Sequence, residues 1–116
     1  MSKSLHHQIV ARAREIITDP DRWMQGEFAV ARDFSPADPT DAEAYRFCAV
    51  GALRRAAYQL ASADRHLANH VQTALETFVH VRHPELEDDL EILNDEGNGH
   101  AQVLRVFDEF LAAEAV

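Results

Sequence analysis

Apolar side chains recur every three or four residues along most of this chain, which is the spacing of amphipathic α-helices. The most apolar stretch has a stripe of small and aliphatic residues at Ala49, Leu53, Ala56 and Leu60. Its opposite side is also largely apolar, which is typical of a buried helix. Gly51 costs about 1 kcal/mol relative to alanine inside a helix, so we expect another segment to pack closely there. We predict a central helix over about 40–60.

Four further stretches carry the same spacing and predict helices. Their predicted bounds are about 4–18, 62–82, 84–93 and 100–113. Ser4 and Ser62 have the side chain of a helix N-cap, and Pro84 suits the first position of the short third stretch. The pair His83–Pro84 ends the helix before it, because proline cannot continue a helix.

The region before the central helix is the least regular. Residues 27–33 alternate only loosely and are predicted to be extended or a short helix, and 34–39 is predicted to be a loop because it holds two prolines. Thr40 or Asp41 would then cap the central helix. The predicted fold is all-α, a single compact bundle-like domain over 1–116. It has about five helices and one short irregular or extended segment near 27–38.

Composition narrows the classes of function. The 116 residues carry 20 acidic and 11 basic side chains, a net charge of −9, which disfavours direct binding to nucleic acid and allows a partner with a basic surface. No apolar run approaches the roughly 20 residues of a membrane span. A single cysteine excludes an intrachain disulfide and makes the cytoplasm the expected location. Ten of the eleven basic residues are arginine, which suggests a GC-rich bacterial genome.

The chain contains the residue types that nucleophilic cysteine chemistry requires, namely Cys48, His100 and the neighbouring Asn94 and Asp95. Such chemistry needs a thiolate, a neutral imidazole that takes its proton, and an orienting Asn or Asp. An imidazole near a helix N-terminus, as predicted for His100, stays neutral more readily. A helix beginning near Thr40 would leave Cys48 mid-helix, where a thiol is usually inert and packs as a small apolar group. Packing is therefore preferred, and no catalytic residue is assigned.

Trp23 and two histidines give two further candidates. Trp23, the only tryptophan, either anchors a loop on the core or walls a pocket with Cys48 and His100. His66 and His70 lie four residues apart, a spacing that lets two imidazoles reach one metal ion from a helix face. No third ligand follows at a fixed spacing, so a solvated helix flank is preferred, and no metal or other cofactor is predicted.

Residues 85–96 hold seven acidic side chains among twelve positions, interleaved with leucine and isoleucine. This interleaving indicates a packed helix with a charged outer face rather than a charged tail. Such a face usually keeps a protein soluble, and the alternative is a docking surface for a basic partner. The residues of this candidate surface are Glu85, Glu87, Asp88, Asp89 and Glu91.

Three short motifs together resemble a known family. They are Trp23-Met24-Gln25-Gly26, then Phe47-Cys48-Ala49-Val50-Gly51-Ala52-Leu53, then Asn94-Asp95 with Gly99-His100 and Val103-Leu104. This combination resembles a family of short bacterial and phage-associated proteins described only as a domain of unknown function. The resemblance covers most of the chain from Trp23 to about Leu111. It implies a compact α-rich fold and a shared Trp, Cys, Asn-Asp and His set, and it implies no activity.

Two functional hypotheses follow. The leading one is a small acidic helical protein that acts by protein–protein interaction, on a partner with a basic surface or as a homodimer. It depends on the net negative charge, the acidic stretch and the lack of a catalytic signature. The alternative is a Cys/His hydrolase or a small-ligand pocket built from Trp23, Cys48, His100 and Asn94 or Asp95.

Overall fold

The computed structural model describes residues 4–61 and 65–114, and most of them are helical. The helices are α1 (Leu5–Ile16), α2 (Ala49–Ala61), α3 (Arg65–Arg82), α4 (Leu90–Asp95) and α5 (Gly99–Glu114). A 3-10 turn, η1 (Pro20–Arg22), and the strands β1 (Ala29–Val30) and β2 (Arg46–Phe47) lie between α1 and α2. The all-α prediction is therefore right in outline and is corrected by this small sheet.

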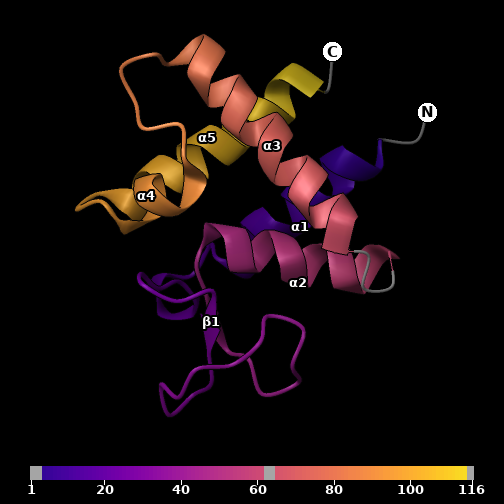
Figure 1. Ribbon diagram of the computed structural model, residues 1–116, viewed down its shortest axis with the longest axis vertical. Helices are drawn as coiled ribbons and strands as arrows, with labels where there is room; N and C mark the ends of the chain where they lie inside the picture. The colour runs from indigo at the N-terminus through magenta and orange to yellow at the C-terminus, as the bar shows by residue number, and fades with distance from the viewer. Residues whose placement is uncertain (1–3, 62–64, 115–116) are drawn as a thin grey trace.

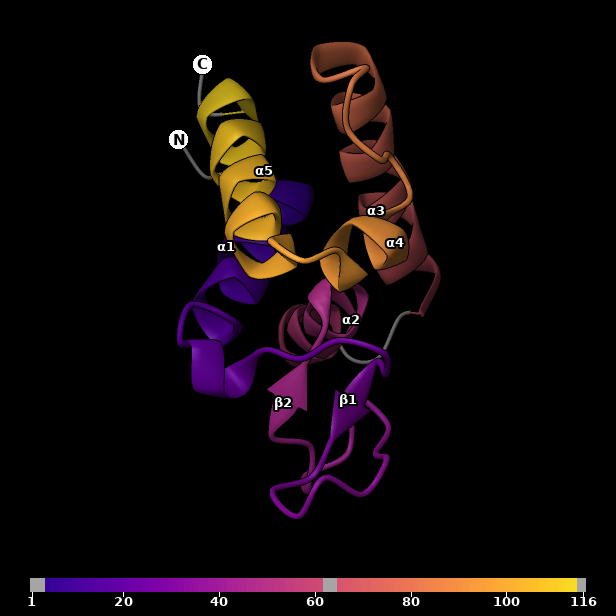
Figure 2. The ribbon, with the colours of Figure 1, turned by 90° about the vertical axis from the view of Figure 1, so that its left-hand side faces the viewer.

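Helix α2 lies across the middle of the molecule. Figure 1 places α3, α4 and α5 on one side of it and the strands with their loops on the other, and Figure 2 shows the two strands side by side below α2. The buried side chains of all five helices, α1 to α5, form one hydrophobic cluster. Seven of the thirteen α2 residues are buried, as expected for a central element.

The close approach predicted at Gly51 is confirmed. A Cβ atom at Gly51 would lie 1.8 Å from the backbone oxygen of Phe28, far inside van der Waals contact. The contact brings the segment before β1 directly against the first turn of α2. The neighbouring backbone of Cys48 donates to the same Phe28 oxygen at 3.2 Å, so this segment and the start of α2 are held together.

The start of α2 differs from the prediction. It begins at Ala49 rather than near residue 40, because Asp38 and Asp41 accept from the backbone N–H groups two residues further on and so form local turns. The chain then pairs with β1 in an antiparallel register that places Ala29 opposite Phe47. The loosely alternating 27–33 segment contains β1, and 34–39 is a loop as predicted.

The predictions for the other helix ends are partly confirmed. Ser4 caps α1 by accepting from the His7 backbone N–H at 3.1 Å, as predicted. Helix α3 ends before His83, also as predicted, whereas the predicted cap Ser62 lies outside the described residues. Helix α4 begins at Leu90 instead of Pro84, because Asp89 caps it and the Leu90 N–H donates to a Glu76 carboxylate on α3 at 2.9 Å.

Candidate functional site

Asn94, on α4, is the buried polar side chain of the described residues, with an exposed fraction of 0%. Its Oδ1 accepts from Trp23 Nε1 at 2.7 Å and from the Ala49 backbone N–H at 2.9 Å. Its Nδ2 donates to the Met24 backbone oxygen and to Asp95 Oδ1, both at 3.0 Å. A carboxamide has two donors and two acceptor lone pairs, so this side chain is saturated. We call these five residues the Asn94 hub.

The segment after Trp23 is tied to the end of α4 by further bonds. Gln25 Nε2 donates to the backbone oxygens of Asn94 at 3.2 Å and Glu96 at 2.7 Å. The Gly26 N–H donates to Asp95 Oδ1 at 3.1 Å, and Gly26 has a φ of +89°, which glycine adopts without strain. The first two of the three sequence motifs therefore meet the third at one place in the fold.

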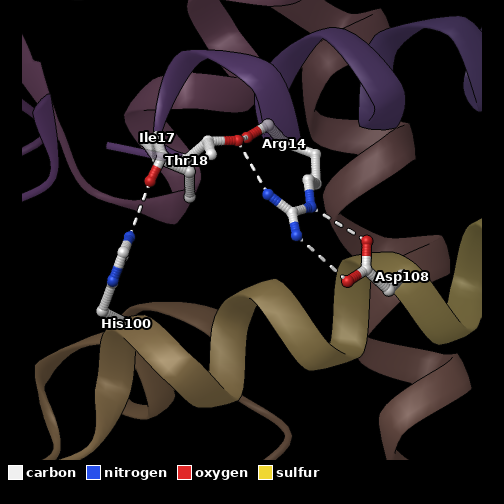
Figure 3. Close-up of polar contacts among 5 residues, drawn as sticks. All are labelled: Arg14, Ile17, Thr18, His100 and Asp108. Atoms are coloured by element: carbon white, nitrogen blue, oxygen red, sulfur yellow. Dashed lines mark hydrogen bonds and ion pairs between the residues drawn. The ribbon is translucent and has the colours of Figure 1, made fainter. Parts of the chain in front are cut away.

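His100 contacts the hub from the start of α5. Its ring lies 5.0 Å from the Trp23 ring, centroid to centroid, and its Nε2 is 2.7 Å from the backbone oxygen of Ile17. Because the partner is a carbonyl, Nε2 carries the proton and donates. Figure 3 shows this bond beside a second link between α5 and α1, in which Arg14 donates to both Asp108 oxygens at 2.9 and 3.2 Å.

Cys48 is the N-cap of α2. The Ala52 N–H donates to its backbone oxygen at 2.8 Å, and the Gly51 N–H donates to its sulfur at 3.3 Å. The predicted mid-helix position is therefore wrong, because α2 starts nine residues later than expected. A helix N-terminus lowers a thiol pKa, but burial outweighs that effect here and raises the pKa of Cys48 to about 11.

Cys48 lines a small cavity of about 110 Å³. Its lining residues are Gly26, Glu27, Phe28, Cys48, Glu91 and Asp95. The two carboxylates of Glu91 and Asp95 also raise the Cys48 pKa, because they disfavour a second negative charge.

The structure thus divides the candidate pocket residues into two sets. Trp23 and His100 are in ring contact, and Trp23 is bonded to Asn94. Cys48 shares its cavity with Asp95, and no imidazole is among the described residues that line it. The orienting amide that a Cys/His mechanism needs is occupied elsewhere, because Asn94 is bonded to Trp23 and to the α2 backbone rather than to His100.

The acidic candidate residues lie in the loop before α4 and on α4 itself. Glu85, Asp89 and Glu91 are exposed, and Glu87 and Asp88 are half-buried. Glu85 pairs with His83 at 3.2 Å and Asp88 with His80 at 3.0 Å, and Asp89 caps α4. Among the described residues, no arginine lies within ion-pair distance of these five carboxylates. We call them the acidic surface.

His66 and His70 are both exposed on α3. Within residues 4–61 and 65–114, no group of three histidine, cysteine, aspartate or glutamate side chains is arranged to hold a metal ion.

Sequence reasoning missed the central role of Asn94. It selected Asn94 for a different role, as a group that orients His100, and it did not include Ala49 or Met24, whose backbone groups complete the hub. The identity of a side chain does not show whether the backbone N–H or C=O group of that residue will bind a distant side chain. The available signal was an asparagine that directly follows two apolar residues at the end of a predicted helix, because a polar side chain next to the core is buried only with hydrogen-bond partners.

Comparison with known proteins places the chain in one family. Residues 1–113 match a family of unknown function, DUF6197, and the chain belongs to that family. No curated protein and no solved structure matches it. No helix among the described residues is long and apolar enough to cross a membrane.

Proposed function

We propose that this protein is an interaction module whose acidic surface binds a basic, amphipathic segment of another protein. The observation that carries the proposal is the lack of an arginine partner for these carboxylates among the described residues. Glu85 and Asp88 pair with histidines, and Glu87, Asp89 and Glu91 have no ion-pair partner among the described residues. Carboxylates without a cationic partner in their own chain attract a partner of opposite sign.

The distribution of charge along the chain supports the proposal. Residues 4–61 carry seven arginines and eight acidic residues, so they are close to neutral. Residues 65–114 carry three arginines and eleven acidic residues, so nearly all of the net charge of −9 belongs to this part. A field concentrated on one region steers a basic partner to that region during encounter.

Ile92 gives the surface an apolar contact point. It lies on α4 next to Glu91, and 51% of it is exposed although most aliphatic residues of the fold are buried. Interfaces gain affinity from apolar anchors surrounded by polar residues, and charges at the rim mainly set the rate of association. A partner helix with arginines or lysines beside a leucine stripe matches this arrangement.

The test is the binding of a labelled amphipathic peptide, with basic residues on one face and leucines on the other, followed by fluorescence anisotropy. We expect the triple variant Glu87→Gln/Asp88→Asn/Glu91→Gln to weaken binding about tenfold, which corresponds to about 1.4 kcal/mol. The matched control neutralises three exposed acids of the 31–45 loop, Asp33→Asn/Asp41→Asn/Glu43→Gln, on the other side of α2.

If the two triple variants lose peptide affinity equally, the binding depends on the net charge of the protein alone, and the proposal is contradicted. Binding to the unmodified protein should weaken as salt rises, and Ile92→Ser should lower affinity without changing that salt dependence. Size-exclusion chromatography of the protein without peptide distinguishes peptide binding from homodimer formation, because a homodimer elutes earlier than a monomer even when no peptide is present.

A further inference from the structure

A cavity of about 390 Å³ lies between α1, η1, β2 and α2, away from the acidic surface. Figure 2 shows α1 and the turn after it beside α2 and β2. Its volume falls within the range of roughly 300–1,000 Å³ that is usual for small-molecule sites. Three guanidinium groups line it, those of Arg12, Arg22 and Arg55, and we call it the arginine cavity.

The arginines are held in place by bonds that use only part of each guanidinium. Arg22 Nε donates to the Tyr45 backbone oxygen at 2.6 Å, and its Cζ lies 4.4 Å from the centre of the Tyr45 ring. Arg55 Nη1 donates to the backbone oxygens of Pro39 at 3.1 Å and Asp41 at 2.7 Å. Both side chains are half-buried, and no described residue accepts from their remaining nitrogens.

Arg12, on α1, is the third arginine that lines the cavity. Its Nε donates to Gln59 Oε1 at 2.9 Å and its Nη1 to Glu15 at 3.2 Å. Glu15 and Asp19 are the acidic residues of the lining, and Asp19 already accepts from the Asp21 N–H as the cap of η1. Three cations therefore face two carboxylates, and this cavity is locally positive in a protein whose net charge is −9.

We propose that the arginine cavity binds a small molecule that carries a phosphate monoester. A guanidinium fork matches the oxygens of a carboxylate or of a phosphate, and one fork is enough for the two oxygens of a carboxylate. Arg22 and Arg55 each keep two nitrogens for the terminal oxygens of a phosphate dianion, and Arg12, whose Nε and Nη1 are bonded to Gln59 and Glu15, adds a third positive charge. Tyr45, which is half-buried, lines the same cavity and is the aromatic side chain that a ring on the ligand would contact.

The test uses isothermal titration calorimetry with phenyl phosphate, inorganic phosphate and benzoate as probes. We expect phenyl phosphate to bind more tightly than either of the other two, because it alone supplies both the dianion and the ring. Tighter binding of benzoate would overturn the assignment to phosphate. A lack of detectable heat with phenyl phosphate in the millimolar range would overturn the site itself.

Variants locate the binding. Arg22→Gln and Arg55→Gln should each weaken phenyl phosphate binding at least ~10-fold, since each removes charged hydrogen bonds to the ligand. Arg32→Gln is the matched control, because Arg32 also lies over the Tyr45 ring, at 4.2 Å, but does not line the cavity. A loss in Arg32→Gln equal to that in Arg22→Gln would contradict the proposal.

A third variant separates binding from folding. Arg22→Lys keeps the positive charge and loses the planar fork, so we expect affinity between those of the unmodified protein and Arg22→Gln. The thermal midpoint of each variant is measured in the absence of ligand. Weakened binding with an unchanged midpoint supports a direct contact, and weakened binding that only follows a lowered midpoint counts against it.

Discussion

The Asn94 hub and the arginine cavity differ in how far the hydrogen-bonding groups of their side chains are satisfied within the protein. At the hub, both amide atoms of Asn94 are fully bonded within the protein. In the cavity, Arg22 and Arg55 are positioned by one nitrogen each. Saturated polar networks fix a fold, whereas positioned but unsaturated donors are suited to a ligand.

The comparison also explains why the cysteine, asparagine and histidine set is better understood as structural. Cys48 caps α2 with its sulfur, Asn94 binds the next backbone N–H, and His100 binds the last turn of α1. Each of these side chains satisfies a helix end that would otherwise lack a partner. The arginines were not candidates from sequence, yet they line the larger cavity.

The largest effect is expected at the hub itself. Asn94→Leu removes four hydrogen bonds and leaves the Trp23 and Ala49 N–H groups unpaired near the core, so we expect a loss of about 3 kcal/mol or more in the free energy of unfolding. Urea denaturation followed by circular dichroism measures it. Asn69→Leu, at an exposed position within α3, is the control and should change stability by less than about 0.5 kcal/mol. Similar values for the two variants would contradict a structural hub.

The next effect concerns the contact between α2 and the segment before β1. Gly51→Ala places a methyl group against the Phe28 backbone, which has to move, and we expect a cost of about 2 kcal/mol. Gly97→Ala adds the same group where no heavy atom lies within 4 Å, so it should be close to neutral. Thermal unfolding of both variants makes the comparison, and a neutral Gly51→Ala would argue against this packing.

A smaller loss is expected where α5 meets α1. His100→Ala removes the donor to the Ile17 oxygen and the contact with Trp23, at a cost of about 1 kcal/mol. His66→Ala, on the exposed flank of α3, is the control. If His100 supplied a reaction instead, its loss would leave stability unchanged, and denaturation curves distinguish the two outcomes.

The smallest effect is the pH dependence contributed by Cys48. Its pKa is raised from the ordinary value of 9.0 to about 11, so its contribution to stability is present below pH 9 and is lost as the pH rises towards 11. The stability difference between the unmodified protein and Cys48→Ala should therefore shrink across that window. Alkylation near neutral pH should be slow and should speed up in denaturant, whereas rapid labelling of the folded protein would indicate a reactive thiol.

Much of the helical framework was predictable, because it is encoded locally. The spacing of Leu5, Ile9 and Ala13 with a serine before it predicts α1, and proline after His83 ends α3. The start of α2 was not predictable, because the side chains of Asp38 and Asp41 form turns and the chain after them pairs with β1. Pairing between segments that are distant in sequence leaves no short-range pattern.

The sites were predictable only as residue types. Trp23, Cys48 and His100 were predicted to form one group, whereas in the structure the rings of Trp23 and His100 are in contact and Cys48 lines a cavity that neither of them lines. The arginine cavity draws its lining from four elements, and its arginines are spaced irregularly along the chain. No periodicity predicts such a convergence, which depends on how α1 packs against α2.

The hydrogen bond between Asn94 and Ala49 also bears on the order of assembly. The two residues are 45 positions apart, and Trp23 is 71 positions before its partner. During synthesis from the N-terminus, the strand pair and the first turn of α2 leave the ribosome well before Asn94 does. The Trp23 and Ala49 N–H groups therefore gain their Asn94 partner only when α4 arrives, so we expect nascent chains that stop short of α4 to be open to proteases around Trp23.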